Sequence, residues 1–121
     1  MPYTINSEPR GSYRKFSGHV TLDEFNQSMA DVHNRPDFDR LRYSISDFLE
    51  VQSFSVDAKA VTMAVAYGIG AAKTNASMKL AMVAVDPKVL ELLELYAKRV
   101  PYSLQIFSSL SAARAWAIGG A

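Results

Sequence analysis

Residues 41–48 read Leu-Arg-Tyr-Ser-Ile-Ser-Asp-Phe, and Leu-Glu-Val-Gln-Ser-Phe-Ser-Val-Asp follows at 49–57. Apolar and polar residues alternate in the first stretch, which is the period-two pattern of a β-strand. We expect this strand to end at Asp47, followed by a loop and the start of a helix. In an open α/β sheet, ligands bind in the crevice outside the carboxyl ends of the strands. This stretch is therefore where a functional group is expected.

A capped amphipathic helix precedes the strand. Thr21 and Glu24 have the spacing of a capping box, in which each side chain satisfies a free backbone donor at the helix start. Apolar residues then recur at helical spacing through Val32. The helix is expected to end near Asn34, because Pro36 disfavours helical geometry in the residue before it.

Two short strands, 3–6 and 12–17, are predicted at the start of the chain. They flank the turn-forming segment Ser-Glu-Pro-Arg-Gly, which favours a hairpin. We expect Gly18 to end the second strand, and its mixed pattern indicates a partly exposed face. Arg14 is assigned to solvated surface together with the other basic residues of this region.

A helix over 57–72 is predicted after the central strand, with Asp57 or Ser55 as its cap. It is rich in alanine and apolar almost all round, so it needs cover on every side. Part of it, with Met63, Tyr67 and Ile69, either belongs to the core or lines an apolar pocket or a dimer face. The core interpretation is preferred.

Two further strand–helix pairs complete the chain. Residues 78–85 form a near-continuous apolar run, typical of a parallel strand covered on both faces. Asp86-Pro87 begins a helix that Pro101 ends. A short strand over 103–107 precedes a last helix capped by Ser108 or Ser109.

The resulting order is β-β-α-β-α-β-α-β-α. It predicts an α/β fold in which an N-terminal β-hairpin is followed by alternating helices and strands. We expect a four- or five-stranded mixed sheet with four helices, and right-handed crossovers between parallel strands. No linker divides the chain, so residues 1–121 are expected to form a single domain.

Composition excludes several function classes. Thirteen basic and twelve acidic residues leave a net charge of +1, which gives no case for nucleic acid or an anionic membrane. The absence of cysteine excludes disulfides and thiolate chemistry. The longest mostly apolar run, 60–72, is too short to span a bilayer, which needs about 20 residues. The first residues lack the pattern of a signal peptide, so we expect a cytoplasmic protein.

Four motifs carry a family resemblance. Phe-Ser-Gly-His-Val-Thr-Leu-Asp-Glu-Phe lies at 16–25, Ser-Asp-Phe at 46–48, Lys-Leu-Ala-Met-Val at 79–83, and Ile-Phe-Ser-Ser-Leu-Ser-Ala-Ala-Arg-Ala-Trp at 106–116. With these motifs the chain resembles, over nearly all its length, the SpoIIAA-like group, relatives of the STAS domain (sulphate transporter and anti-sigma-factor antagonist). The resemblance implies a STAS-like fold. None of the motifs is catalytic, so they indicate packing rather than function.

The same resemblance implies a test of function. Anti-sigma-factor antagonists carry a phosphorylatable serine in an Asp-Ser-Ser/Thr-Gly-like motif at the helix start after the third strand. Here the matching stretch, 54–61, reads Phe-Ser-Val-Asp-Ala-Lys-Ala-Val, and the motif is missing. Ser53 and Ser55 are nearby, so a phospho-regulated antagonist using one of them is the alternative function.

The candidate residues each have a plainer interpretation. Asp47 could contact a ligand, but a loop aspartate commonly accepts backbone hydrogen bonds, and this is preferred. Ser53, Ser55 and Asp57 could bind an anion at a helix N-terminus. Helix capping explains the same residues with fewer assumptions and is also preferred.

No catalytic set can be assembled from the sequence. His19 and His33, the only histidines, lie at opposite ends of the first helix, roughly 20 Å apart, and cannot share a metal ion. We expect no metal, no cofactor and no enzymatic activity. The leading hypothesis is a binding or regulatory module in a bacterial-type cytoplasm. It would bind a protein partner or a small apolar ligand through the ends of the third strand and the second helix, and a homodimer is a further way to cover that helix.

Overall fold

The computed structural model describes residues 3–55 and 57–119. Their elements, in chain order, are β1 (Tyr3–Glu8), β2 (Gly11–Thr21), α1 (Leu22–His33), the 3-10 turn η1 (Phe38–Arg40), β3 (Tyr43–Ser55), α2 (Ala58–Ala72), β4 (Lys79–Val83), α3 (Pro87–Ala97), β5 (Ser103–Phe107) and α4 (Leu110–Gly119).

The strands form a five-stranded sheet in the order β1-β2-β3-β4-β5. β1 pairs with β2 as an antiparallel hairpin, and the other three pairings are parallel. This confirms the predicted mixed sheet, with its N-terminal hairpin and alternating order. Because each parallel strand lies beside its predecessor, the sheet contains no reversal of strand order.

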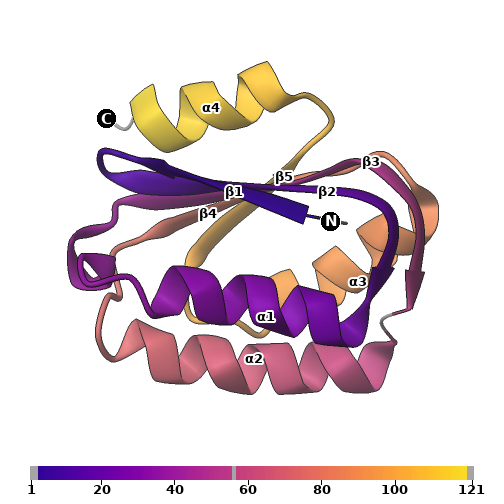
Figure 1. Ribbon diagram of the computed structural model, residues 1–121, viewed down its shortest axis with the longest axis horizontal. Helices are drawn as coiled ribbons and strands as arrows, with labels where there is room; N and C mark the ends of the chain where they lie inside the picture. The colour runs from indigo at the N-terminus through magenta and orange to yellow at the C-terminus, as the bar shows by residue number, and fades with distance from the viewer. Residues whose placement is uncertain (1–2, 56, 120–121) are drawn as a thin grey trace.

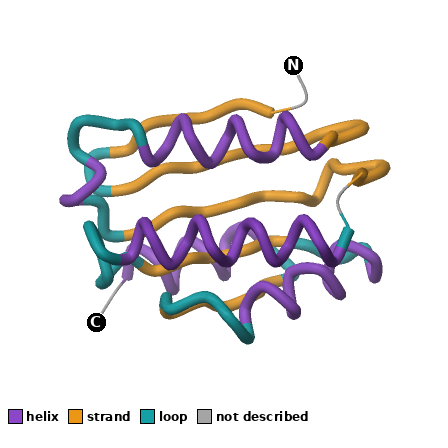
Figure 2. The backbone as a smooth tube through the Cα atoms, turned by 90° about the horizontal axis from the view of Figure 1, so that it is seen from below, coloured by secondary structure: helices purple, strands orange, loops and turns teal. Residues whose placement is uncertain are grey.

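The helices form two unequal layers. α1, α2 and α3 lie on one face of the sheet, and α4 lies alone on the other (Figure 1). Crossovers of one hand put their helices on one face, which is the arrangement seen for the three parallel connections. Seen from that face, α1 and α2 run side by side across the sheet (Figure 2).

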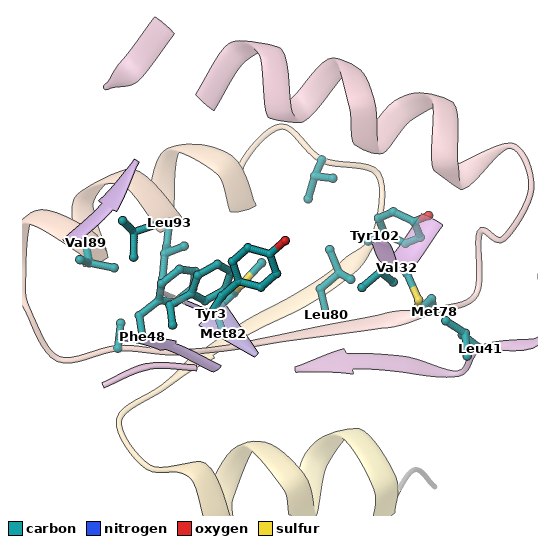
Figure 3. Close-up of a cluster of buried hydrophobic side chains, with 14 of the residues drawn as sticks. Tyr3, Val32, Leu41, Phe48, Met78, Leu80, Met82, Val89, Leu93 and Tyr102 are labelled. Carbon is teal, nitrogen blue, oxygen red and sulfur yellow. The ribbon is translucent and has the colours of Figure 1, made fainter. Parts of the chain in front are cut away.

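Each face of the sheet carries its own core. The larger core lies between the sheet and α1–α3, with Phe48, Met82 and Leu93 among its buried side chains (Figure 3). The smaller core lies beneath α4, around Ile45 and Val83. β4 is thus covered on both faces, as its continuous apolar run predicts.

The predicted helix caps are confirmed. Thr21 and Glu24 form the capping box of α1. Asp57 caps α2 by accepting a hydrogen bond from the Ala60 amide at 2.9 Å. Asp86 caps α3, in which Pro87 is the first residue. These signals are local in sequence, so the helix starts could be predicted accurately.

Several predicted strand ends are wrong, and the largest differences are at the ends of β2 and β3. β3 continues past Asp47 to Ser55, and β2 continues past Gly18 to Thr21, because the two strands keep pairing with each other. Their register shifts twice on the way, at Lys15/Ser17 and at Gly18/His19. Gly18 has a φ of 66°, so it makes a kink within β2 rather than its end.

The assignment of Arg14 to solvated surface is also wrong. Arg14 is only 7% exposed, and the neighbouring Phe16 is fully buried on the same face of β2. α1 covers this face, whereas Tyr13, Lys15 and Ser17 on the opposite face are partly exposed, as the mixed pattern of the strand predicts.

In the described part of the chain, no helix has the length and apolar character needed to cross a membrane.

Candidate functional site

A two-stranded ribbon extends β2 and β3 beyond the rest of the sheet. The pairing of β3 with β4 ends at Asp47 and Val83, and from Glu50 to Ser55 β3 pairs with β2 alone. The ribbon bends toward the side of α1–α3 (Figure 1). The carboxyl end of the central strand therefore lies at Ser55, beside the start of α2, and not at Asp47.

A groove of about 770 Å³ lies under this ribbon. We call it the edge groove; its lining residues are Val51, Gln52, Ser53, Phe54, Ala58, Asp86, Pro87, Lys88, Val89, Glu91, Leu92 and Leu95. They come from β3, the first residue of α2, and the start and exposed side of α3. The edge groove therefore occupies the carboxyl edge of the sheet, where the sequence predicts a site.

The edge groove has an apolar interior and a charged rim. Val51 and Phe54 contribute apolar side chains from β3, and both pack against the larger core. Leu95 of α3 is 37% exposed, which is high for a leucine. Asp86, Lys88 and Glu91, all exposed, alternate in charge along the α3 side. An apolar centre with a polar rim is the usual composition of a surface that binds another protein.

A histidine links the two candidate serines beside the edge groove. The Nδ1 atom of His19 lies 2.6 Å from the Ser53 hydroxyl, and its Nε2 atom lies 3.0 Å from the Ser55 hydroxyl. All three side chains are exposed. A neutral imidazole has one donor and one acceptor nitrogen, so one hydroxyl donates to the ring and the other accepts from it. We call this set the His19 cluster.

The sequence interpretation missed His19. Ser53 and Ser55 are two positions apart in β3 and therefore lie on the same face of the strand, which can be predicted from the sequence. His19 joins them because it is paired with Ser53 in the ribbon. That pairing depends on the continuation of β2 past Gly18, which the sequence interpretation excluded.

Asp47 lies apart from the edge groove. It is 4% exposed in the middle of β3, on the side of the sheet that α4 covers. One carboxylate oxygen accepts a hydrogen bond from the Tyr13 hydroxyl at 2.6 Å, and the other accepts from the Leu49 amide at 2.9 Å. Burial and the hydrogen bond to Asp47 raise the pKa of Tyr13. Both oxygens of Asp47 are thus used within the fold.

Asp57 immediately precedes α2, near the edge groove. Its carboxylate serves the helix cap, as described above, which matches the capping alternative. Ser53 lines the edge groove, whereas Ser55 and Asp57 do not. The structure therefore brings Ser53 and Ser55 together with His19, whereas Asp57 acts as a helix cap.

Met63, Tyr67 and Ile69 are exposed by 57%, 42% and 48%. The core interpretation is wrong for these three residues. α2 lies between α1 and α3 and buries a face of small side chains, which includes Ala64 and Gly68. A Cβ atom on Gly68 would lie 2.8 Å from a Val100 methyl group, so the close packing there excludes larger residues.

Of these three residues, Tyr67 borders a cleft at the end of α1. It borders an open cleft of about 630 Å³ between the end of α1, η1 and α2, and its ring stacks on that of His33 at 4.7 Å. Met63 and Ile69 line neither this cleft nor the edge groove.

Within residues 3–55 and 57–119, no three histidine, aspartate or glutamate side chains are grouped so that they could hold a metal ion. The edge groove and the His19 cluster offer apolar contact area, two hydroxyls and an imidazole ring. Such a surface can bind a chain or accept a modification.

No protein-family model matches the chain, and no curated protein matches it either. Solved structures do match. The anti-sigma factor antagonist SpoIIAA in its unphosphorylated form has a TM-score of 0.68 at 9% identity, covering 98% of this chain and 99% of that one. The phosphorylated form of SpoIIAA, the Bacillus cell fate determinant, gives a TM-score of 0.59 at 9% identity over 91% of this chain and 95% of that one.

A further match is an uncharacterised DUF3478 protein with a SpoIIAA-like fold from Shewanella loihica PV-4. Its TM-score is 0.63 at 13% identity, over 95% of this chain and 91% of that one. Likeness at these identities concerns the fold.

Proposed function

We propose that this chain, which has a SpoIIAA-like, STAS-like fold, is a non-enzymatic regulatory module that binds a protein partner through the edge groove. The observation that carries this proposal is the apolar, solvent-accessible interior of the groove within a rim of alternating charge. We place this module in a bacterial-type cytoplasm.

A protein partner suits the groove better than a small apolar ligand. Leu95 lies on the outer side of α3 and is exposed, so a small ligand beside it would stay partly in water. A partner chain covers the leucine and meets the rim charges at once, which gives both apolar burial and specificity. One of the similar structures is that of an anti-sigma factor antagonist, a protein named for its action on another protein.

Charge in the edge groove provides the test. Leu95→Glu places a carboxylate on the apolar lining of the groove, and Ile118→Glu places one at an exposed apolar residue of α4, on the other face of the sheet. We expect the unmodified protein to capture a partner in an affinity experiment. The amount of partner captured should fall roughly tenfold or more for Leu95→Glu and stay unchanged for Ile118→Glu.

Thermal unfolding of both variants verifies that they fold. Equal capture by all three proteins, or capture of nothing above background, would contradict the proposed function.

A second candidate function rests on the His19 cluster. Ser53 and Ser55 are exposed, and each hydroxyl contacts the imidazole. A phosphoserine carries about −1.5 to −2 charges and would accept a hydrogen bond from the His19 ring. SpoIIAA is known in phosphorylated and unphosphorylated forms, which supports a phospho-switch here, although the Asp-Ser-Ser-Gly pattern is absent.

Mass spectrometry after incubation with a serine-kinase extract tests this candidate. The switch requires that the kinase adds phosphate to Ser53 or Ser55. The Ser53→Ala/Ser55→Ala double variant should abolish this phosphorylation. The control Ser108→Ala, which changes an exposed serine elsewhere, should leave it unaffected. Absence of phosphate at both positions under kinase conditions that modify a known substrate rules the switch out.

A further inference from the structure

A buried arginine lies in the larger core without an acidic partner. Arg14 is 7% exposed on the α1–α3 face of β2. Its terminal nitrogens donate to two buried hydroxyls, those of Ser28 at 2.9 Å and Ser46 at 2.7 Å. Among the described residues, no carboxylate forms an ion pair with it. Its Nε–H group is buried and has no hydrogen-bond acceptor.

Two other buried polar atoms near Arg14 lack partners as well. They are the Nδ1 atom of His33 and the hydroxyl of Tyr102. Both residues line, together with Arg14, one internal cavity of about 30 Å³. Met78 and Leu80 form part of its wall, beside Tyr102 (Figure 3). In the part of the chain that the structure describes, these three are the buried side-chain polar atoms without a partner, and one cavity gathers all of them.

A second cavity, of about 40 Å³, adjoins the first. The two share Arg14, Met29, Met82 and Tyr96 as lining residues. The rest of the second wall is apolar and comprises Phe25, Phe54, Ala60, Val61, Ala64, Leu92 and Leu93. We call the pair the Arg14 cavities. Arg14 therefore borders both a cavity that contains unpartnered polar atoms and a largely apolar cavity.

An unpaired buried charge is costly. Removing a guanidinium from water costs several kcal/mol, which hydroxyl partners offset only in part. The aromatic rings of Phe16 and Phe25, 5.5 and 6.0 Å from the guanidinium carbon, add weak cation–π attraction. Burial accordingly lowers the pKa of Arg14 to about 10. An anion would satisfy the free Nε–H and neutralise the charge together.

The walls and the volume restrict the anion. At roughly 10–15 Å³ for each water-sized group, the two cavities together have room for about five to seven heavy atoms. A bare inorganic anion would leave the apolar part empty. A carboxylate on a short alkyl chain, such as butyrate with its six heavy atoms, matches both parts.

We infer that the Arg14 cavities bind a short-chain monocarboxylate, whose carboxylate pairs with the Arg14 guanidinium and whose alkyl chain lies against the apolar wall between α1, α2 and α3. The site is separate from the His19 cluster and does not depend on the proposed function. Ser28 and Ser46 hold the guanidinium in place for the ligand.

Sodium butyrate is the probe. We expect it to raise the thermal unfolding temperature and to give a saturable calorimetric titration, whereas sodium chloride at equal ionic strength and neutral butyramide do not. In a series from acetate to octanoate, affinity should peak near four carbons. In proton–nitrogen spectra, butyrate should shift the Arg14 Nε–H signal, because that group gains an acceptor.

Arg14→Met keeps an apolar side chain of similar length and removes the charge. We expect butyrate affinity to fall roughly tenfold or more in this variant, since a charge-assisted hydrogen bond is lost. Arg10→Met, which changes an exposed arginine, is the matched control and should bind as the unmodified protein does.

Four results would overturn the inference. They are an equal effect of chloride, an equal effect of butyramide, unchanged binding by Arg14→Met, and an Arg14 Nε–H signal that butyrate leaves in place. The last measurement uses the unmodified protein, so it decides the question even if Arg14→Met does not fold. Leu95→Glu should bind butyrate normally, which separates this outcome from the fate of the edge groove.

Discussion

At the scale of single residues, His33 is held in a neutral state by its surroundings. Its ring stacks on Tyr67 at 4.7 Å and contacts Phe38 edge-on at 4.9 Å. Burial, and then the nearby charge of Arg14, lower the pKa of His33 from 6.5 to about 4. The unfolded chain therefore takes up a proton at a higher pH than the folded one does.

This difference sets the direction of a pH effect. Above pH 6.5, His33 is neutral in both the folded and the unfolded protein, and its contribution to stability is complete. As the pH falls toward 4, the unfolded protein takes up the proton first, so the folded protein loses stability. We expect the loss to be at most about 1.4 kcal/mol per pH unit, and less because the ring is partly exposed. Urea unfolding between about pH 7 and 5 measures it.

His33→Gln supplies the control for this pH effect. The variant lacks the titrating ring, so its free energy of unfolding should vary less over the same range. If the free energy of unfolding varied with pH in the same way for the unmodified protein and His33→Gln, the pKa of His33 would be the same in the folded and the unfolded protein.

At the scale of elements, the ribbon formed by β2 and β3 depends on the kink at Gly18. A Cβ atom there would meet no other atom within 4 Å, so space does not restrict this position. Its φ of 66° does, because left-handed backbone costs a residue with a Cβ roughly 1–2 kcal/mol. The kink lies in the part of β2 that pairs with the end of β3.

Gly18→Ala should therefore destabilise the protein by about 1 kcal/mol or more in chemical denaturation. Gly70→Ala is the matched change at a helical glycine that also has open space around its Cβ position, and it should stabilise by roughly 0.5–1 kcal/mol. If both variants shifted stability in the same direction, the backbone at Gly18 would not be under this constraint.

The elements also show what could be predicted from the sequence. Thr21, Asp57 and Asp86 mark helix starts through hydrogen bonds to residues two or three positions away, so local sequence is sufficient. The ends of β2 and β3 depend on pairing between segments more than 30 residues apart, which no local pattern records.

The candidate site divides in the same way. Ser53 was predicted as part of the site because it lies near the start of a helix, and the edge groove includes it. His19 was missed because its place is set by strand pairing. Arg14 was assigned to the surface because acidic residues close in sequence could offset it, and no local pattern records that α1 covers its side chain.

At the scale of the whole molecule, one ion pair connects the two ends of the described chain. Arg114 of α4 donates to both carboxylate oxygens of Glu8 in β1, at 3.1 and 2.9 Å, across 106 positions in sequence. The Tyr43 hydroxyl donates to the same carboxylate. Hydrogen bonds from Arg114, and then from Tyr43, lower the pKa of Glu8 despite its partial burial.

A double-mutant cycle with Glu8→Gln and Arg114→Gln should give a coupling energy of about 1 kcal/mol in the free energy of unfolding, since the pair is bidentate and only partly exposed. The more exposed pair of Lys15 and Glu50 should couple more weakly, because water screens it. A coupling for Glu8 and Arg114 no larger than that of the exposed pair would mean that this ion pair contributes little to holding α4 on the sheet.

The unreversed strand order also has a consequence for how the chain folds. β2, β3, β4 and β5 occupy the sheet in the order in which they are synthesised, and each has only one helix to complete before it meets its neighbour. The sheet can therefore grow in one direction, by short loop closures that favour rapid folding. α4 is the exception, because it packs back over β3 and β4 and can do so only once the last strand is in place.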